Sequence, residues 1–383
     1  MKRAIVIYIG NVLHCPPALS LVQILNNLEI ETHLITVEND DKTISYSIGD
    51  AKNVRFAFVS KNYKNDTSVL IKLLRMFVIR HKIWKYIDNI YDNETIIWIV
   101  SEGSVKHVGN RITKYNYILH LLELNEGIYY LSGNPILKMN YKMIAKKARV
   151  VVEAEYNRAH ITKAWWGLDK LPMIYPNKPF NIININKRST ITSNEEIKET
   201  IEKIKNKKIV LYQGNMSKER PLLPFIEAVC ELGEEYAFVM MINGDNPYTE
   251  LKYENFYCLP FIAPPHHLEV TSHAFIGVLS YSPVKNDYSI LNTLFCAPNK
   301  IWEYSKFGIP MISNDLPALR MINYEFNNLV VVDDVSKENI KKAILKINDN
   351  YQLYSNNSKL FYESINMVDV VKNILSKSEK NES

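Results

Sequence analysis

Short apolar runs rich in Val and Ile alternate with longer stretches of mixed polarity in the first half of the chain. The runs have the length of strands, and several of the stretches between them are typical of helices. Strands are predicted at residues 4–9, 32–37, 54–59, 96–100, 117–122 and 150–152, and helices at 18–28, 69–90 and 157–166. Nearly continuous apolar strands that alternate with helices indicate a parallel sheet covered on both faces.

A polar segment of low complexity, residues 181–208, interrupts this pattern and is predicted to be a linker followed by one charged helix. The alternation then resumes. Strands are predicted at 209–212, 237–242, 255–259, 275–279, 310–312 and 329–332, and helices at 222–232 and 299–307. The predicted fold class is α/β, with two doubly wound, Rossmann-like domains at 1–180 and 181–365 that face each other across a cleft, and a C-terminal tail at 366–383.

The composition suits an enzyme with two ordinary cores. The chain has 383 residues, a hydrophobic fraction of 47% and a formal net charge of +5. This mild excess of positive charge suits anionic substrates or an anionic membrane surface and does not require nucleic acid. The four cysteines stand far apart without a CxxC pair, which indicates free thiols in a reducing compartment. We therefore expect a cytoplasmic protein, either free or at the inner face of the membrane.

Two segments bear on membrane contact. Residues 1–20 pass from a short apolar run into a polar loop, which indicates a first core strand rather than a signal peptide. No stretch of about 18 apolar residues lacks charge, so no transmembrane helix is expected. Residues 69–87 carry Lys and Arg among apolar side chains. A core helix with a basic outer edge is slightly favoured for them over an interfacial membrane helix.

The stretch with the clearest chemistry is CAPNKIWEYSKFGIPMISND, residues 296–315. Pro298 suits the first position of a helix, where its missing N–H would be unpaired anyway. Gly308 suits the helix end. A helix between them would present the amides of Asn299 and Lys300 at its N-terminus, where partial positive charge binds phosphate.

Lys300 and Glu303 add side-chain chemistry to this helix start. The ammonium of Lys300 adds a full positive charge, and the carboxylate of Glu303 can accept two hydrogen bonds from a vicinal diol such as a ribose. The same two residues lie three apart in the sequence and could instead form a surface ion pair worth a few tenths of a kcal/mol. Their spacing alone favours the surface pair.

The segment PNKIWEYSKFGIPMISND resembles a motif in the C-terminal domain of GT-B glycosyltransferases, in particular the GT4-like group that builds bacterial surface polysaccharides. The resemblance implies a hexosyltransferase-type enzyme that moves a sugar from a UDP- or GDP-linked donor to a glycan or lipid-linked acceptor. It implies that Glu303 binds the ribose. The diphosphate would bind at the helix start, formed by Ala297, Pro298, Asn299 and Lys300.

The resemblance also implies chemistry without a metal ion. Helix amides and a basic side chain would then stabilise the departing nucleoside diphosphate in place of a cation. Asp333 and Asp334 lack the spacing and partners of a metal site. We therefore expect neither a metal nor another cofactor.

A second segment, LYQGNMSKERPLLPFIEAV, resembles the first loop of that C-terminal domain, where a basic residue meets the donor pyrophosphate. The strand ends in a turn at Gly214. Arg220 is the first candidate for the phosphate contact, and Lys218 is the second, for which a solvated loop charge is an equal alternative. The family has Arg directly after the glycine, where this chain has Asn215.

A third segment, YCLPFIAPPHHLEVTSHAFIGVLSYSP, resembles the base-binding part of the family. The backbone at Phe261 and Ile262 would contact the nucleobase, and Gly244 allows a sharp turn after the preceding buried strand. His266 and His267 precede a helix. They are interpreted as surface or capping residues, because no third metal ligand is suitably spaced.

One position departs from the family pattern in a way that affects the donor sugar. The family often carries a Glu eight residues before the residue that matches Glu303, where this chain has Phe295. The contact with the donor sugar is then expected from Asn292 or from the backbone of Cys296 and Ala297. The identity of the sugar is left open.

The first domain is expected to bind the acceptor at the carboxyl ends of its strands. YILHLLELN resembles a strand that ends in an acidic pair near the reacting sugar, which makes Glu123 the candidate catalytic residue. A structural Glu that faces a loop is nearly as well supported there. The segment VVVEAEYNRAHI resembles a family segment of Glu, one variable residue and then Asn-Arg-Ala, in which Glu155 is the Glu. Glu155 is equally consistent with an acid that stabilises the start of its own helix.

Two other functions compete with glycosyl transfer. The same fold occurs in sugar-nucleotide 2-epimerases, which need several acids and bases around the sugar. It would also suit a catalytically inactive binding subunit, an alternative to which Phe295 lends some support. Analysis of the reaction products separates the three.

Overall fold

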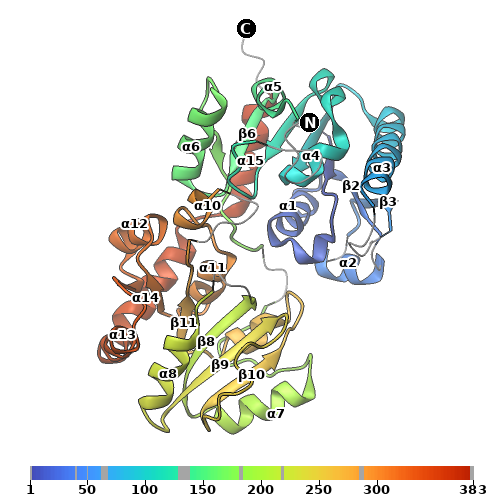
Figure 1. Ribbon diagram of the computed structural model, residues 1–383. Coiled ribbons are helices and arrows are strands. Elements are labelled where there is room, and N and C mark those ends of the chain that lie inside the picture. The colour runs from blue at the N-terminus through green and yellow to red at the C-terminus, as the bar shows by residue number, and fades with distance from the viewer. Residues whose placement is uncertain are drawn as a thin grey trace. The chain divides into compact units, whose positions relative to one another are not determined.

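The computed structural model describes residues 2–38, 41–49, 51–61, 68–127, 139–180, 184–216, 220–283 and 289–379. The chain forms two compact units (Figure 1). Unit 1 consists of Met1–Ile182, Asn286–Asn292 and Asn366–Ser383, and unit 2 consists of Ile183–Lys285 and Thr293–Ile365. Lys218, a candidate phosphate contact, lies outside the described residues.

Unit 1 is built on a parallel sheet in the order β3-β2-β1-β4-β5-β6-β7. Its strands are β1 (Arg3–Ile7), β2 (Glu31–Val37), β3 (Val54–Ser60), β4 (Thr95–Val100), β5 (Tyr117–His120), β6 (Val150–Glu153) and β7 (Met173–Ile174). The order reverses between β1 and β4, as in doubly wound sheets. The predicted strands of this half are present, because strands buried on both faces, such as β1, β2 and β4, are rich in Val, Ile and Leu.

The remaining elements of unit 1 are α1 (Pro16–Asn27), α2 (Asp41–Ile48), α3 (Val69–Ile90), α4 (Glu102–Val108), α5 (Tyr141–Lys147), α6 (Tyr156–Trp166) and α15 (Met367–Glu379), with 3-10 turns η1 (Val12–His14) and η2 (Asn110–Lys114). Helix α3 has its predicted bounds, and the Ser68 side chain caps its first turn. Helices α2, α4 and α5 are not predicted from the sequence. Each has only seven or eight residues, too few for a helical period to stand out.

The predicted C-terminal tail, residues 366–383, contains helix α15. This helix contacts α1 and β6 of unit 1. Its buried residues include Met367, Val371, Ile374 and Leu375, which recur at helical spacing on one face. The segment packs on unit 1 because this apolar stripe is removed from water there.

Unit 2 repeats the architecture with a parallel sheet in the order β10-β9-β8-β11-β12-β13. Its strands are β8 (Lys208–Asn215), β9 (Tyr236–Asn243), β10 (Phe256–Pro260), β11 (Ile276–Leu279), β12 (Met311–Asn314) and β13 (Leu329–Val332). The other helices among the described residues are α7 (Glu195–Ile204), α8 (Leu223–Glu231), α9 (His267–Thr271), α10 (Leu291–Leu294), α11 (Asn299–Lys306), α12 (Pro317–Phe326), α13 (Lys337–Asp349) and α14 (Tyr351–Glu363). The predicted α/β class with two Rossmann-like domains is confirmed.

The reversal of strand order in unit 2 falls between β8 and β11. In doubly wound sheets, ligands bind beyond the carboxyl ends of the strands at this reversal. The elements that follow β8 and β11 are therefore the first place to look for a binding site. The loop after β8 leads to α8, and the chain after β11 leads to α11.

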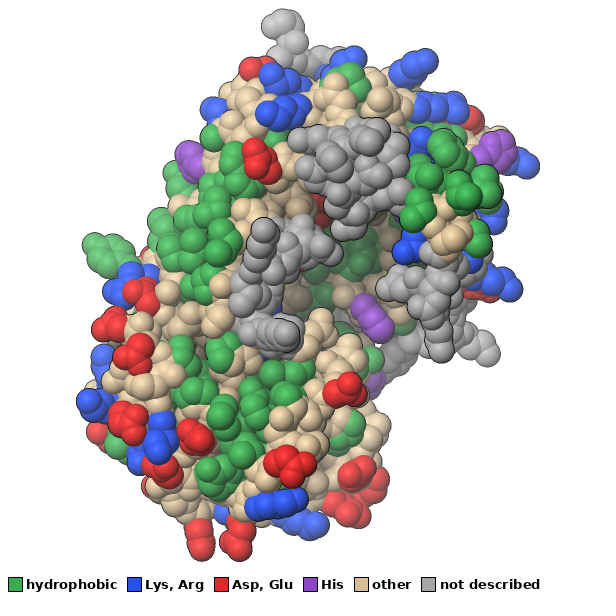
Figure 2. Space-filling model, viewed as in Figure 1, with side chains coloured by type: hydrophobic (Ala, Val, Ile, Leu, Met, Phe, Trp, Pro, Cys, Tyr) green, Lys and Arg blue, Asp and Glu red, His purple; other side chains and the backbone are tan. Residues whose placement is uncertain are grey.

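Helix α3 divides its surface between core and solvent. Met76, Ile79, Ile83, Trp84 and Ile87 are buried on its inner side. The opposite side exposes apolar and basic side chains, visible at the position of α3 in the space-filling view (Figure 2). Within the described part of the chain, no helix is both long and apolar enough to cross a membrane.

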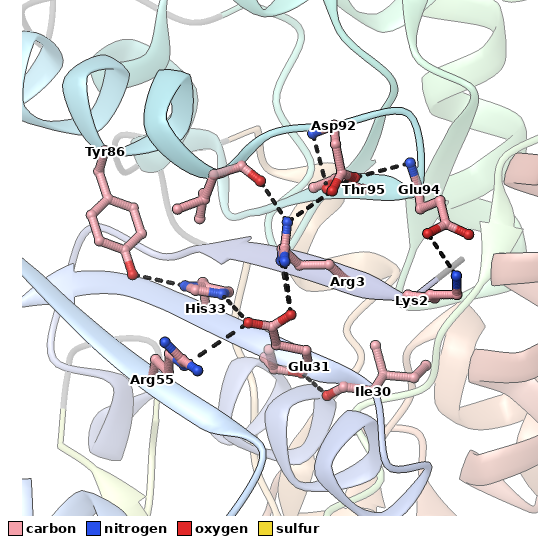
Figure 3. Close-up of polar contacts among 12 residues, drawn as sticks. Lys2, Arg3, Ile30, Glu31, His33, Arg55, Tyr86, Asp92, Glu94 and Thr95 are labelled. Carbon is pink, nitrogen blue, oxygen red and sulfur yellow. Dashed lines mark hydrogen bonds and ion pairs between the residues drawn. The ribbon is translucent and has the colours of Figure 1, made fainter.

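A charged network ties the amino ends of β1 and β2 to the end of α3 (Figure 3). The Arg3 guanidinium donates to Glu31 Oε2 (3.0 Å), to the Ile90 carbonyl (2.7 Å) and to Asp92 Oδ2 (3.0 Å). Glu31 Oε1 lies 3.0 Å from His33 Nε2. The hydrogen bonds from His33 and Arg3 hold the pKa of the Glu31 carboxyl below its usual value. The network lies at the edge opposite to the ligand-binding edge of a doubly wound sheet, which indicates a structural role.

The linker before α7 belongs to the core of unit 2. Ile185 and Ile191 are buried there. The Glu269 carboxylate of α9 accepts hydrogen bonds from the backbone N–H and the hydroxyl of both Thr192 and Ser193. Burial alone would raise the pKa of Glu269, but hydrogen bonds, led by those from Thr192, lower it to about 2.

Replacing Glu269 by Gln should lower the free energy of unfolding of unit 2 by roughly 1.5–3 kcal/mol, the value of a hydrogen bond to a charged group. Because the folded-state pKa lies below the unfolded value of about 4.3, the stabilisation is full above that pH and is lost as the pH falls toward 2. Urea unfolding at pH 7 and at pH 3 measures this difference. Glu234→Gln, at an exposed position of the same unit, is the control. Equal unfolding midpoints for Glu269→Gln and wild type at pH 7 would contradict the assignment.

Candidate functional site

Helix α11 is fixed tightly to the sheet of unit 2. Tyr304 packs on Gly277 of β11, where an added Cβ atom would overlap the Tyr304 ring. The Tyr304 hydroxyl donates to the Leu211 carbonyl of β8 (2.9 Å). Trp302 stacks on Phe361 with 4.2 Å between ring centroids. The helix thus contacts both strands at the reversal of the strand order, and the place of its first turn is determined.

The helix has its predicted start at Asn299, but Pro298 lies one position before the helix and not at its first position. Pro298 is the N-cap with extended backbone (φ −72°, ψ 135°), and Asn299 is the first helical residue. A proline φ near −65° is compatible with both conformations, so the residue type does not distinguish them. No side chain among the described residues caps this helix start. The N–H groups of Asn299 and Lys300, just after the half-buried Ala297, are the donors that a first turn leaves without intrahelical partners.

The Glu303 carboxylate is buried, with the residue only 6% exposed. Its Oε2 accepts a hydrogen bond from Gln213 Nε2 (2.6 Å), and its Oε1 lies 3.2 Å from His267 Nε2. Burial disfavours the charged form, but His267, Gln213 and Lys300 together hold the pKa of Glu303 below its ordinary value. The alternative that Lys300 and Glu303 form a surface ion pair is therefore wrong.

The orientation of Gln213 is fixed by a second hydrogen bond. The Thr271 hydroxyl donates to Gln213 Oε1 (2.6 Å), which leaves the amide N–H₂ group directed at Glu303. A carboxylate has about four lone-pair positions for hydrogen bonds. The two contacts of Glu303 use two of them, so a diol could still be accepted by the others.

The interpretation of His267 as a surface or capping residue is wrong. Its side chain is 12% exposed and contacts Glu303, while its Nδ1 is buried and has no hydrogen-bond partner among the described residues. His266 lies with Nδ1 3.1 Å from Glu269 Oε1 and does not cap α9 through its side chain. The contact of His267 with Glu303 leaves no local signal in the sequence, because it joins residues 36 positions apart on two different helices.

Two cations meet on one aromatic ring at the carboxyl edge of the sheet. The Arg220 guanidinium carbon lies 4.1 Å from the centroid of the Tyr281 ring, and Lys300 Nζ lies 5.3 Å from the same centroid. Lys300 Nζ is also 4.3 Å from the Tyr212 ring centroid. An added Cβ atom at Gly214, where φ is +126°, would lie 3.5 Å from Lys300 Nζ. The structure thus brings Arg220, Lys300 and the Gly214 turn together.

Lys300 is poised to change its charge near neutral pH. Burial and the positive charge of Arg220 lower the pKa of Lys300 to about 7, although Glu303 acts in the opposite direction. Placing a second positive charge beside Arg220 is unfavourable without an anion nearby. An anion bound at this point would relieve that repulsion and raise the pKa of Lys300.

The other predicted residues of unit 2 also follow strands of its sheet. Gly244, with φ +112°, follows β9, and the 40% exposed Phe261 and the buried Ile262 follow β10. Tyr281 follows β11 and is held by Asn314 of β12. The Tyr281 N–H donates to Asn314 Oδ1 (3.0 Å), and Asn314 Nδ2 donates to the Tyr281 carbonyl (2.6 Å). Because the strands are parallel, these groups lie at one edge of the sheet. Tyr281 and Asn314 are not predicted from the sequence, since neither belongs to a recognisable spacing.

In unit 1 the candidate catalytic residue, Glu123, lies on a loop held by buried polar groups. Glu102 Oε1 accepts hydrogen bonds from the N–H groups of Leu122 (2.8 Å) and Glu123 (3.0 Å). Asn292 Nδ2 donates to Glu123 Oε2 (2.6 Å), while Asn292 Oδ1 accepts from the Leu124 N–H (2.9 Å). Glu102 therefore holds the backbone at Glu123, and Asn292 orients the Glu123 side chain.

Asn292 lies in a different place from the one expected. The sequence analysis assigns it to the second domain as a contact of the donor sugar, whereas the structure groups it with unit 1. Arg158 of α6 fixes it by donating to the carbonyls of Asn292 (3.0 Å) and Leu122 (3.0 Å). The Asn292 side-chain amide donates to Glu123, so Asn292 orients the candidate catalytic residue.

Two more carboxyl groups are buried beside this loop. Burial raises the pKa of Glu102 to about 8 and that of Glu153 to about 7. Glu153 accepts a hydrogen bond from the Thr162 hydroxyl (2.5 Å). His120 is fully buried, and neither of its ring nitrogens has a hydrogen-bond partner among the described residues. Burial lowers the pKa of His120 to about 3, so His120 is neutral at pH 7, while Glu102 and Glu153 have pKa values close to neutral pH.

Glu155 stabilises the start of its own helix, which is the structural role that the sequence analysis considers for it. Its side chain caps α6 by accepting hydrogen bonds from the Arg158 N–H (3.0 Å) and from Asn157 Nδ2 (2.7 Å). A carboxylate at this position also interacts favourably with the helix dipole.

No group of three or more His, Cys, Asp or Glu side chains in the described ranges could hold a metal ion. The positive charge at the carboxyl edge of unit 2 comes instead from Arg220, Lys300 and the start of α11.

No protein-family model matches the chain, and no curated protein matches it in sequence. Solved structures are similar over its whole length. HepE of Anabaena, solved in complex with UDP and glucose, superposes with a TM-score of 0.68 at 11% identity and covers 100% of both chains. A glycosyltransferase of Rickettsia africae has a TM-score of 0.64 at 13% identity, with 99% of this chain and 98% of that chain covered.

Sucrose-phosphate synthase of Thermosynechococcus elongatus has a TM-score of 0.63 at 12% identity and covers 99% of this chain and 96% of that chain. At identities this low, the superpositions establish a shared fold and nothing further. The chain therefore has the GT-B fold, in which two Rossmann-like α/β domains are joined in one polypeptide.

Lys300 should titrate near pH 7 in the ligand-free protein. Reductive methylation with ¹³C-formaldehyde labels lysine amines, and NMR follows each labelled signal with pH. The signal that Lys300→Arg removes should titrate far below the usual lysine value of about 10.4. Arg220→Gln should move that midpoint upward, because it removes a neighbouring positive charge. A Lys300 signal that titrates above about pH 9.5, close to an unperturbed lysine, would contradict the site geometry.

Proposed function

We propose that the chain is a glycosyltransferase that moves a sugar from a nucleotide sugar, UDP- or GDP-linked, to a glycan or lipid-linked acceptor in surface polysaccharide or glycoconjugate biosynthesis. One observation carries the proposal. Arg220 and Lys300 meet on the Tyr281 ring at the carboxyl edge of unit 2, one helical turn from the buried Glu303 carboxylate. Two cations beside a carboxylate that can accept hydrogen bonds from a ribose diol fit a nucleoside diphosphate.

The GT-B fold adds support. HepE was solved with UDP and with UDP-glucose, which makes a uridine nucleotide the first donor to test. In the proposed complex the diphosphate lies at the N-terminus of α11 between Arg220 and Lys300. The ribose hydroxyls donate to Glu303, and the base contacts the backbone at Phe261 and Ile262.

In the proposed transfer, the bond between the anomeric carbon of the sugar and the diphosphate oxygen breaks, and the acceptor hydroxyl oxygen forms the new bond to that carbon. The diphosphate leaves with additional negative charge, which Arg220, Lys300 and the α11 amides stabilise. Glu123, oriented by Asn292, is the candidate for taking the proton of the acceptor hydroxyl.

The donor site predicts a difference between UDP and uridine. Arg220→Ala should weaken UDP binding about ten- to a hundredfold, since a hydrogen bond to a charged group contributes roughly 1.5–3 kcal/mol. Uridine, which lacks the phosphates, should be affected much less. Glu303→Gln should weaken both ligands, because both contain the ribose. Isothermal titration calorimetry measures the affinities (GDP and guanosine replace them if the protein selects guanine).

Arg320→Ala is the control for this experiment. Arg320 belongs to the same unit and pairs with Asp315 on the surface. The control should bind both ligands as the wild type does. Equal losses of UDP and uridine affinity in Arg220→Ala would mean that Arg220 does not read the phosphates.

We also propose that the transfer needs no metal ion. Product formation from a nucleotide sugar should persist in excess EDTA, because the protein's own cations neutralise the leaving diphosphate. Chromatography of the products gives the result. Complete loss of product in EDTA that Mn²⁺ or Mg²⁺ restores would contradict this proposal. Epimerised nucleotide sugar, or no turnover of any nucleotide sugar, would point to the two competing functions.

A further inference from the structure

The outward face of α3 exposes large apolar side chains that do not belong to the core of unit 1. Leu70 is 73% exposed, Leu74 65%, Phe77 56% and Val78 54%. These positions follow one another at spacings of one to four residues and lie on one side of the helix. Contiguous exposed apolar surface of this kind marks an interaction site.

The opposite face of α3 holds the helix in place independently. The Arg80 guanidinium donates to the carbonyls of Lys106 (2.6 Å) and His107 (3.2 Å), and Trp84 Nε1 donates to the Val108 carbonyl (2.9 Å). The helix is therefore anchored to α4 along its second half. The contacts with α4 fix the orientation of the exposed face of α3.

The charge on α3 has a single sign over most of its length. No Asp or Glu occurs between residues 69 and 87, and the first acid, Asp88, is paired with Arg111. His81, Lys82 and Lys85 are exposed and continue the outward face in the second half of the helix. The exposed side chains of the first half are thus mostly apolar, with Lys72 as an exposed cation among them, and those of the second half are basic up to residue 87. Figure 2 shows this mixture of hydrophobic, His and basic side chains at the position of α3.

We propose that the outward face of α3 binds an anionic lipid surface. The apolar first half would enter the interface between headgroups and acyl chains, and the basic second half would contact the phosphate groups. This inference rests only on α3 and does not depend on the proposed glycosyl transfer.

The same pattern disfavours a second copy of the chain as the occupant. A twofold contact with parallel helices would bring the basic halves together, and like charges repel. A contact with antiparallel helices would bury the basic half of each copy against the apolar half of the other, which removes charges from water without partners. An anionic bilayer satisfies both halves at once.

The test is sedimentation of the full chain with vesicles. Vesicles of phosphatidylcholine with phosphatidylglycerol should bind the protein at least tenfold more tightly than vesicles of phosphatidylcholine alone, and 0.5 M salt should remove most of the difference, as it does for exposed charges. Lys82→Gln with Lys85→Gln should weaken binding roughly 25-fold, about fivefold for each cation lost. Leu70→Ser with Leu74→Ser should weaken binding at least tenfold.

Two control pairs have the same composition changes on exposed sites of unit 2. Lys342→Gln with Lys346→Gln on α13 and Leu353→Ser with Leu360→Ser on α14 should bind vesicles as the wild type does. All four variants should keep the wild-type thermal unfolding midpoint, because the altered side chains are exposed. Equal binding to the two kinds of vesicle, or α3 variants that bind as the controls do, would overturn the proposal. A dimer in analytical ultracentrifugation that Leu70→Ser with Leu74→Ser abolishes would assign the face to a second copy instead.

Discussion

The burial of one carboxylate constrains the candidate site of unit 2. A charged Glu303 inside the protein requires groups that replace its water, and Gln213, His267 and Lys300 are those groups. Gln213 is oriented by Thr271, so the arrangement extends from β8 through α9 to α11. Any change in the position of α11 would separate the carboxylate from its partners. The close packing of Tyr304 on Gly277 prevents such a change, and it also fixes the first turn of α11.

The two units distribute charge differently at the carboxyl edges of their sheets. Unit 2 gathers two cations around Tyr281, which suits an anion that arrives with its own negative charge. Unit 1 gathers carboxyl groups, and burial raises the pKa of Glu102 and Glu153 to about 8 and about 7. Groups that titrate near neutral pH suit proton transfer better than charge neutralisation. The strand ends of the two units therefore differ in the charge of the side chains that they carry.

Most of the sheet architecture could be predicted from the sequence, because strands buried on both faces are rich in Val, Ile and Leu, and α3 has its predicted bounds. Local signals fail where one residue type serves two conformations, as at Pro298, or where an apolar stripe is hidden in a polar segment, as in α15. Contacts between distant segments leave no local signal at all. The His267–Glu303 contact and the attachment of Asn292 to Glu123 are of this kind. The resemblance to GT-B glycosyltransferases implies roles for Glu303, Lys300 and Arg220, and solved structures at 11–13% identity share the fold of the chain.

A crystal structure of the full chain with bound UDP, or GDP if the protein selects it, would place the nucleotide directly. We expect the diphosphate oxygens to lie about 3 Å from the Arg220 guanidinium and from the first amides of α11, a distance typical of charge-assisted hydrogen bonds. The ribose hydroxyls should lie at the same distance from Glu303. A nucleotide bound at another place, with Glu303 still in contact only with Gln213, His267 and Lys300, would show that the proposed donor site is wrong.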